Sequence, residues 1–75
     1  MSRTEFSSKF KKSMSVFQLA VEGQMDLDMQ HPKVYKKLIK FYQEQGVEFY
    51  DDPTDDYELV LDCLREDLRE CGVAV

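Results

Sequence analysis

The amino-acid sequence predicts an all-α fold, a compact three-helix bundle formed by a single domain over residues 1–75. Three segments carry apolar residues at helical spacing, and each ends at one of the only three glycines in the chain. A chain of 75 residues is too short for two independent cores. We therefore expect the three helices to share one core.

The first segment predicts one continuous helix over about residues 4–22, closed by Gly23. Its apolar residues recur at spacings of three and four, which places them on one stripe: Phe6, Phe10, Met14, Phe17 and Val21. Phenylalanines on such a stripe usually form core. Val16 and Leu19 fall off the stripe, so they either widen the core face or contact a partner.

The second segment predicts a helix over about residues 32–45. Pro32 suits the first helical turn, and Gly46 suits the position after the last one. Apolar residues fill one arc of this helix, and four lysines fill the other: Lys33, Lys36, Lys37 and Lys40. With Glu44 as its one acid, the segment has a net charge of +3.

The third segment predicts a helix over about residues 53–71, with Asp52 as N-cap and Pro53 at the first helical position. Acids in its first turns complement the helix dipole. Between residues 51 and 71, nine acids stand against two arginines, a net charge of -7. The outward face of this helix is therefore strongly acidic.

The connections allow two interpretations. Residues 25–29 alternate apolar and acidic side chains, which favours a loop with apolar side chains in the core over a short strand. The segments Val47–Tyr50 and Val73–Val75 have strand-like composition, so a minor two-strand accessory is the alternative to plain loops. The residues expected to share one core are Phe6, Phe10, Phe17, Leu38, Ile39, Tyr57, Leu61, Leu64 and Leu68.

Composition argues for a cytoplasmic protein without membrane contact. The net charge of -5 and pI of about 4.7 disfavour general binding to nucleic acid or anionic lipid. No apolar run is long enough to span a bilayer, and polar residues 1–12 do not resemble a signal peptide. Cys63 and Cys71 would lie about 12 Å apart on one helix, too far for a disulfide, so we expect reduced thiols.

The sequence offers little for catalysis, so we expect no enzyme, cofactor, metal site or small-molecule substrate. His31 is the only histidine, and its place before Pro32 indicates a solvated or capping side chain. The acids of residues 51–58 lack the glycine and the alternating spacing of a calcium loop. Asp26 and Asp28 are two ligand candidates without the rest of a site.

The outer face of the third predicted helix is the most informative feature, because apolar residues lie there among acids. The candidate partner-binding residues are Asp55, Glu58, Leu59, Asp62, Cys63, Glu66 and Glu70. This pattern is typical of a strip that docks on a basic surface of another protein, with a wider core face or a homodimer seam as the structural alternative. We expect a small acidic regulator or inhibitor, of the kind that phages and mobile elements encode, acting on a nucleic-acid-binding partner as a DNA mimic.

Two other functions remain open. The four lysines of the second helix suit the backbone of a duplex, which is the hypothesis of a dimeric DNA-binding transcriptional regulator. The absence of base-reading arginine or asparagine beside the lysines counts against it. In the second alternative, a homodimer, the lysines of one copy contact the acids of another.

Overall fold

The computed structural model describes residues 3–75, in which five α-helices and one 3-10 turn follow one another. In chain order they are α1 (Arg3–Lys9), η1 (Lys11–Ser13), α2 (Met14–Val21), α3 (Leu27–Gln30), α4 (Pro32–Glu44) and α5 (Pro53–Glu70). No strand occurs in residues 3–75. The fold is mostly helical, as predicted, but it contains more helices than the three expected.

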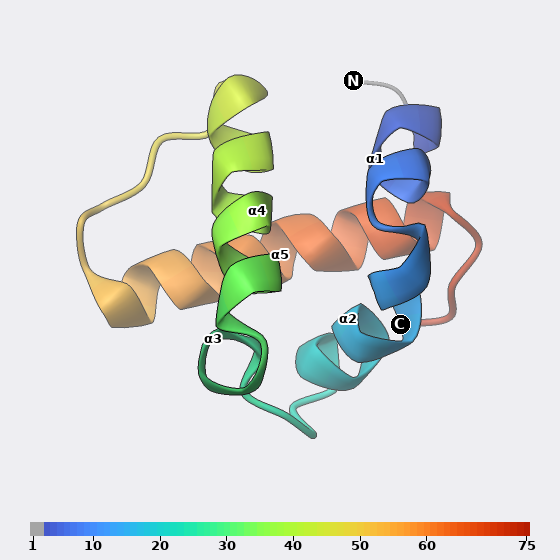
Figure 1. The fold of residues 1–75 in the computed structure, drawn as a ribbon, viewed down its shortest axis with the longest axis horizontal. Helices are drawn as coiled ribbons and strands as arrows, with labels where there is room; N and C mark the ends of the chain where they lie inside the picture. Colours follow the sequence, from blue (N-terminus) through green and yellow to red (C-terminus); the bar gives the residue numbers. More distant parts are fainter. Residues whose placement is uncertain (1–2) are drawn as a thin grey trace.

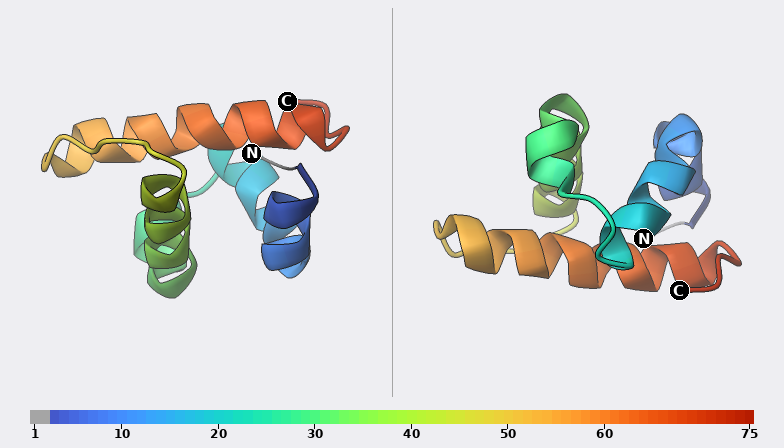
Figure 2. Two further views of the ribbon diagram at one scale, coloured as in Figure 1. Left: turned by 90° about the horizontal axis from the view of Figure 1, so that it is seen from above. Right: turned by 90° about the horizontal axis from the view of Figure 1, so that it is seen from below.

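The longest helix, α5, is the platform on which the others pack. α1, α2 and α4 all contact it. Figure 1 shows α5 crossing behind α4, and the two views of Figure 2 show α1, α2 and α4 on the same side of it. In the described part of the chain, no helix covers the opposite side of α5 (Figure 2).

One hydrophobic core lies between α5 and the helices that stand on it. Its buried apolar residues are Phe6, Phe10, Phe17, Ala20, Leu27, Leu38, Phe41, Tyr42, Val60, Leu64 and Leu68. Six of the nine predicted core residues are in this set. The other three, Ile39, Tyr57 and Leu61, are partly buried and pack against it. The prediction of a single shared core is confirmed.

The prediction of one continuous helix over residues 4–22 is wrong. The chain leaves the α-helix after Lys9, makes the 3-10 turn η1 and resumes at Met14. In a straight helix, Phe6 and Phe17 would be separated by about 16 Å along the axis. In the structure their ring centroids are 6.0 Å apart. The break lets the aromatic side chains of both halves reach the same point in the core.

The alternating segment 25–29 leads into the one-turn helix α3, Leu27–Gln30, instead of forming the loop or strand expected. Leu27 is fully buried, whereas its acidic neighbours Asp26 and Asp28 are exposed. The hydroxyl of Tyr57 accepts a hydrogen bond from the Leu27 amide at 3.0 Å and donates one to the Met25 carbonyl at 3.4 Å. Tyr57 therefore fixes the segment before α3 to α5.

The two-strand accessory predicted from 47–50 and 73–75 does not form. These segments lie before and after α5, whose 18 residues separate them by about 27 Å along the helix axis. Strand pairing requires neighbouring backbones a few ångströms apart. Val47, Phe49, Val73 and Val75 instead pack against the edges of the core as irregular chain.

The predicted bounds of the second and third helices agree with α4 and α5 to within one residue at their C-terminal ends. Gly46 and Gly72 adopt left-handed φ values of 95° and 89° after these helices, a conformation that glycine adopts without strain. Asp52 caps α5 by accepting hydrogen bonds from the amides of Thr54 and Asp55, at 3.0 and 3.1 Å. The N-cap prediction is confirmed.

A buried hydrogen bond joins α4 to α5. The Tyr42 hydroxyl donates to Oδ2 of Asp67 at 2.7 Å, and Asp67 is only 7% exposed. Burial raises the pKa of the Asp67 carboxyl, and Glu70 and Glu66 raise it further, against the opposing effect of the Tyr42 hydrogen bond. The sequence pattern placed Tyr42 on an apolar arc and Asp67 among the acids, so it contained no sign of this pair.

Removing the Phe17 ring should destabilise the domain strongly. We expect Phe17→Ala to lower the free energy of unfolding by about 3–5 kcal/mol, because it removes a fully buried ring that contacts both Phe6 and Phe10. Leu19→Ala, two residues away and 37% exposed, is the control and should cost about 1 kcal/mol or less. Urea unfolding followed by circular dichroism measures both, and equal losses would contradict the core described above.

Asp67 should make stability depend on pH in a direction opposite to that of an ordinary salt-bridged acid. Its pKa in the folded protein lies above the usual value of 3.8. The folded protein therefore binds the Asp67 proton more tightly than the unfolded chain does, and this tighter binding stabilises the fold. The stabilisation is complete when the pH is below the ordinary pKa of 3.8, and it is lost as the pH rises through the pKa of the folded protein. Asp67→Asn cannot titrate and keeps an acceptor for Tyr42. The free energy of unfolding of the wild type, relative to this variant, should fall between acidic and neutral pH; a constant difference would contradict the assignment.

Candidate functional site

The uncovered side of α5 carries the acids that the sequence singled out. Of the seven candidate partner-binding residues, the five acids Asp55, Glu58, Asp62, Glu66 and Glu70 are exposed, and Leu59 and Cys63 are partly buried. From Glu58 to Glu70 the acids recur every four residues, so they form one row along the helix. This row and its immediate neighbours are called the acidic face of α5 below.

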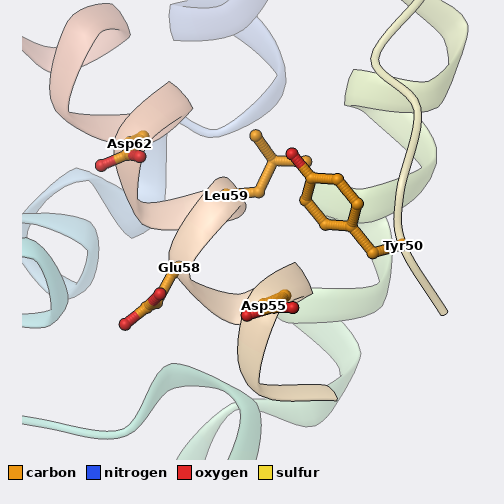
Figure 3. Close-up of a pocket in the computed structure, with 5 residues that line it drawn as sticks. All are labelled: Tyr50, Asp55, Glu58, Leu59 and Asp62. Carbon is orange, nitrogen blue, oxygen red and sulfur yellow. The ribbon is translucent and has the colours of Figure 1, made fainter. Parts of the chain in front are cut away.

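An open hollow of about 340 Å³ lies at the N-terminal half of the acidic face. It is lined by Tyr50, Asp55, Glu58, Leu59 and Asp62. Figure 3 shows the Tyr50 ring reaching over from the segment before α5 to lie next to the Leu59 side chain, with Asp55 near the ring and the carboxylates of Glu58 and Asp62 directed away from it. Four of the five lining residues are among those predicted from the sequence, and Tyr50 is the addition.

The backbone around Tyr50 is held in place by the start of α5. The Tyr50 amide donates a hydrogen bond to Oδ1 of Asp56 at 2.7 Å. Asp51 then adopts a left-handed φ of 60°, a conformation that aspartate tolerates better than most residues, and Asp52 begins the capping of the helix. Tyr50 itself is 66% exposed. A well-held backbone therefore presents a largely exposed aromatic ring.

The sequence contains only a weak signal for Tyr50. Its neighbours Val47 and Phe49 pack against the core, and the strand-like composition of the segment suggested a structural role for all four residues. Alternation with the inward-facing Phe49 was the one available clue that Tyr50 points outward.

Leu59 and Cys63, predicted to act together, have different surroundings. Leu59 lines the hollow, whereas Cys63 packs against the core. Burial raises the pKa of the Cys63 thiol, and the nearby carboxylates of Asp67, Glu66 and Asp62 raise it further. This thiol therefore stays protonated at neutral pH and is a poor nucleophile. Cys71 also packs against the core, and both cysteines are free.

Two further hollows lie beside the first. One, of about 300 Å³, is lined by Asp26, Asp28, Met29, Pro53, Thr54, Tyr57 and Glu58. The other, of about 280 Å³, is lined by Glu58, Leu61, Asp62 and Arg65. Glu58 borders all three, so the hollows adjoin one another along the same half of α5.

Arg65 is the cation that borders this part of the acidic face. Its guanidinium lies 3.3 Å from Oδ1 of Asp62 and donates a second, longer hydrogen bond of 3.4 Å to the Val21 carbonyl. Because the pair with Asp62 is exposed, it contributes little to stability. Arg65 therefore neutralises one acid and leaves Asp55 and Glu58 available to a basic partner.

The lysine face of α4 is equally exposed. Lys33, Lys36, Lys37 and Lys40 lie at the surface, and none of the four forms an ion pair with a carboxylate of the described residues. The positive face is thus a separate feature of the molecule and does not neutralise the acidic face within one copy of the chain.

The described residues show no arrangement typical of a metal centre. Among them, no group of three or more His, Cys, Asp or Glu side chains is placed to hold a metal ion. His31 is partly buried between α3 and α4, and its side chain makes no capping hydrogen bond. Within residues 3–75, no helix combines the length and apolar character needed to cross a bilayer.

Comparison with known proteins identifies no relative. No family model matches the chain, and no curated protein and no solved structure is similar to it. The acidic face and its hollows are therefore the features from which a function is inferred.

The hydrogen bond from the Tyr50 amide to Asp56 can be tested directly. We expect Asp56→Ala to speed hydrogen exchange of that amide by roughly ten- to a hundredfold, because a bond to a carboxylate is lost. Asp55→Ala is the control, since the described residues show no hydrogen bond to the Asp55 carboxylate. Exchange measured by NMR that is unchanged in Asp56→Ala would show that Tyr50 is not held in this way.

Proposed function

We propose that this chain is a small, non-enzymatic protein-binding module that docks the acidic face of α5 on a basic surface of another protein. The observation that carries this proposal is the hollow beside Glu58. Its lining combines three carboxylates with the apolar surfaces of Tyr50 and Leu59. Protein interfaces commonly join a desolvated apolar centre to a charged rim in this way.

The position of α5 supports the same proposal. No helix of the described residues covers its outer side, so a partner could approach the acidic face along its length (Figure 2). An acidic surface of this kind attracts a basic partner over a distance of several ångströms and speeds association, an effect that salt screens. Binding should therefore weaken as ionic strength rises.

A nucleic-acid-binding protein is the partner class that this chemistry favours. The surface of such a protein that receives phosphate groups is basic, and a row of carboxylates can occupy it in place of phosphate. The chain would then act as a regulator or inhibitor that competes with nucleic acid.

The alternative function is DNA binding as a dimer through the lysine face of α4. It is favoured by the exposure of the four lysines and by the absence, among the described residues, of carboxylates paired with them. Against it stand the strongly acidic α5 and the lack of arginine or asparagine on α4 to read bases.

A pull-down from lysate of the source organism, at low and high salt, tests the proposal. The test variant neutralises three acids of the acidic face: Glu58→Gln, Asp62→Asn and Glu66→Gln. We expect the wild type to retain a protein partner at low salt and to release it at high salt. The variant should bind it at least about tenfold more weakly, since several charge contacts are lost together.

The matched control carries Glu5→Gln, Glu22→Gln and Glu44→Gln, which change the net charge equally but lie outside α5. It should bind like the wild type. If the control and the test variant weaken binding equally, the partner is bound through the net charge of the protein and not through the acidic face of α5. A third variant combines Lys36→Gln, Lys37→Gln and Lys40→Gln. If the test variant still recovers nucleic acid and this lysine variant does not, the result would favour DNA binding through the lysine face of α4.

A further inference from the structure

The exposed large apolar side chains are not spread evenly over the surface. Among the described residues there are three: Leu19 at 37% exposed, Met29 at 77% and Tyr50 at 66%. Tyr50 lines one of the hollows that Glu58 borders, and Met29 lines another. The two most exposed apolar side chains therefore line hollows that share one carboxylate of the acidic face, that of Glu58.

Both side chains extend from backbone that is held by hydrogen bonds to α5. The Tyr50 amide donates to Asp56. Met29 belongs to α3, whose first residue, Leu27, is buried and donates its amide hydrogen to the Tyr57 hydroxyl. Neither Tyr50 nor Met29 belongs to the core or packs against it. The packing of the fold therefore explains where the backbone of these two residues lies, but it does not explain why their side chains are apolar.

We propose that Tyr50 and Met29 are the two apolar anchors of the docking surface, and that the partner presents a basic side chain between two apolar ones. This inference rests on the proposed function and specifies the partner's chemistry. One apolar side chain of the partner contacts Tyr50 and Leu59, and the other contacts Met29. The basic side chain between them faces Glu58.

Charge complementarity selects a basic partner for these apolar anchors. Besides Glu58, the two hollows are bordered by four more carboxylates, those of Asp26, Asp28, Asp55 and Asp62. A purely apolar partner would bring uncharged surface against these groups and remove water from them without compensation. A partner that carries cations at the rim retains the apolar contacts and neutralises the acids.

A second copy of this chain does not meet these requirements. Its basic surface is the lysine face of α4, and the apolar residues of that helix lie in the core or against it. In the described residues that face has cations but no large exposed apolar side chain. A different protein is therefore the better occupant.

Selection from a phage-displayed library of random peptides tests the inference and needs no identified partner. The bait is the full chain, in the wild-type form and with Tyr50→Ala plus Met29→Ala. We expect the wild type to enrich peptides in which lysine or arginine is flanked by apolar residues. The enriched peptides, resynthesised, should bind the double variant at least about tenfold more weakly, as is usual for loss of central apolar contacts.

The controls separate this inference from the proposed function. Leu19→Ala removes the third exposed apolar side chain, away from the hollows, and should bind the peptides like the wild type, as should Tyr50→Phe, which keeps the ring. Enrichment of basic peptides without apolar preference, or equal binding by the double variant, would overturn the two-anchor inference and leave the proposed function standing. Peptides with no excess of basic residues would overturn both.

Discussion

Four phenylalanine rings meet at one point of the core, and the arrangement of the helices depends on that contact. The ring of Phe6 lies within 6.0 Å of those of Phe10, Phe17 and Phe41, measured between centroids. These rings come from α1, the residue after it, α2 and α4. Because they converge, the N-terminal segment has to bend at η1, and α4 has to stand beside α1 and α2 on the same side of α5.

That arrangement leaves α5 with two different faces. Its inner side contributes Val60, Leu64 and Leu68 to the core, at the spacing of one helical stripe. Its outer side has no helical neighbour in the described residues, so the acids there stay in water (Figure 2). The same helix also holds the backbone next to both proposed anchors, through Asp56 and Tyr57. The core and the candidate docking surface are thus built on one element.

Sequence reasoning succeeded where one local pattern decides the outcome. The bounds of α4 and α5 followed from the apolar periodicity, the prolines and the Asp52 cap. The same periodicity placed the acids of α5 on the side of the helix that faces away from the core. Sequence reasoning failed where distant residues decide the outcome. The bend at η1 follows from contacts between rings eleven residues apart, although the serines between Ser7 and Ser15 were a local sign of weaker helix preference.

The candidate site was only partly accessible from the sequence for the same reason. A helical wheel places Leu59 among the acids, but it cannot show that Tyr50, from the preceding segment, lies beside it (Figure 3). Nor can it show that Met29 lines a hollow next to Glu58. The pairing of Tyr42 with Asp67 was hidden because each residue was assigned from its own helix, and only the packing of α4 on α5 brings them together.

The distribution of acids along α5 separates those that stabilise the helix from those that do not. Asp52, Asp55 and Asp56 lie at its N-terminal end, where capping and the helix dipole favour negative charge. Glu66 and Glu70 lie in its C-terminal half, where the dipole disfavours negative charge. Like charges four residues apart on a helix also repel by about 0.2–0.5 kcal/mol per pair, an effect that Arg65 offsets at Asp62 within the row from Glu58 to Glu70. Capping and the helix dipole therefore explain the first group, whereas neither of them favours the second, and a basic partner would reduce the repulsion between neighbouring acids of the row.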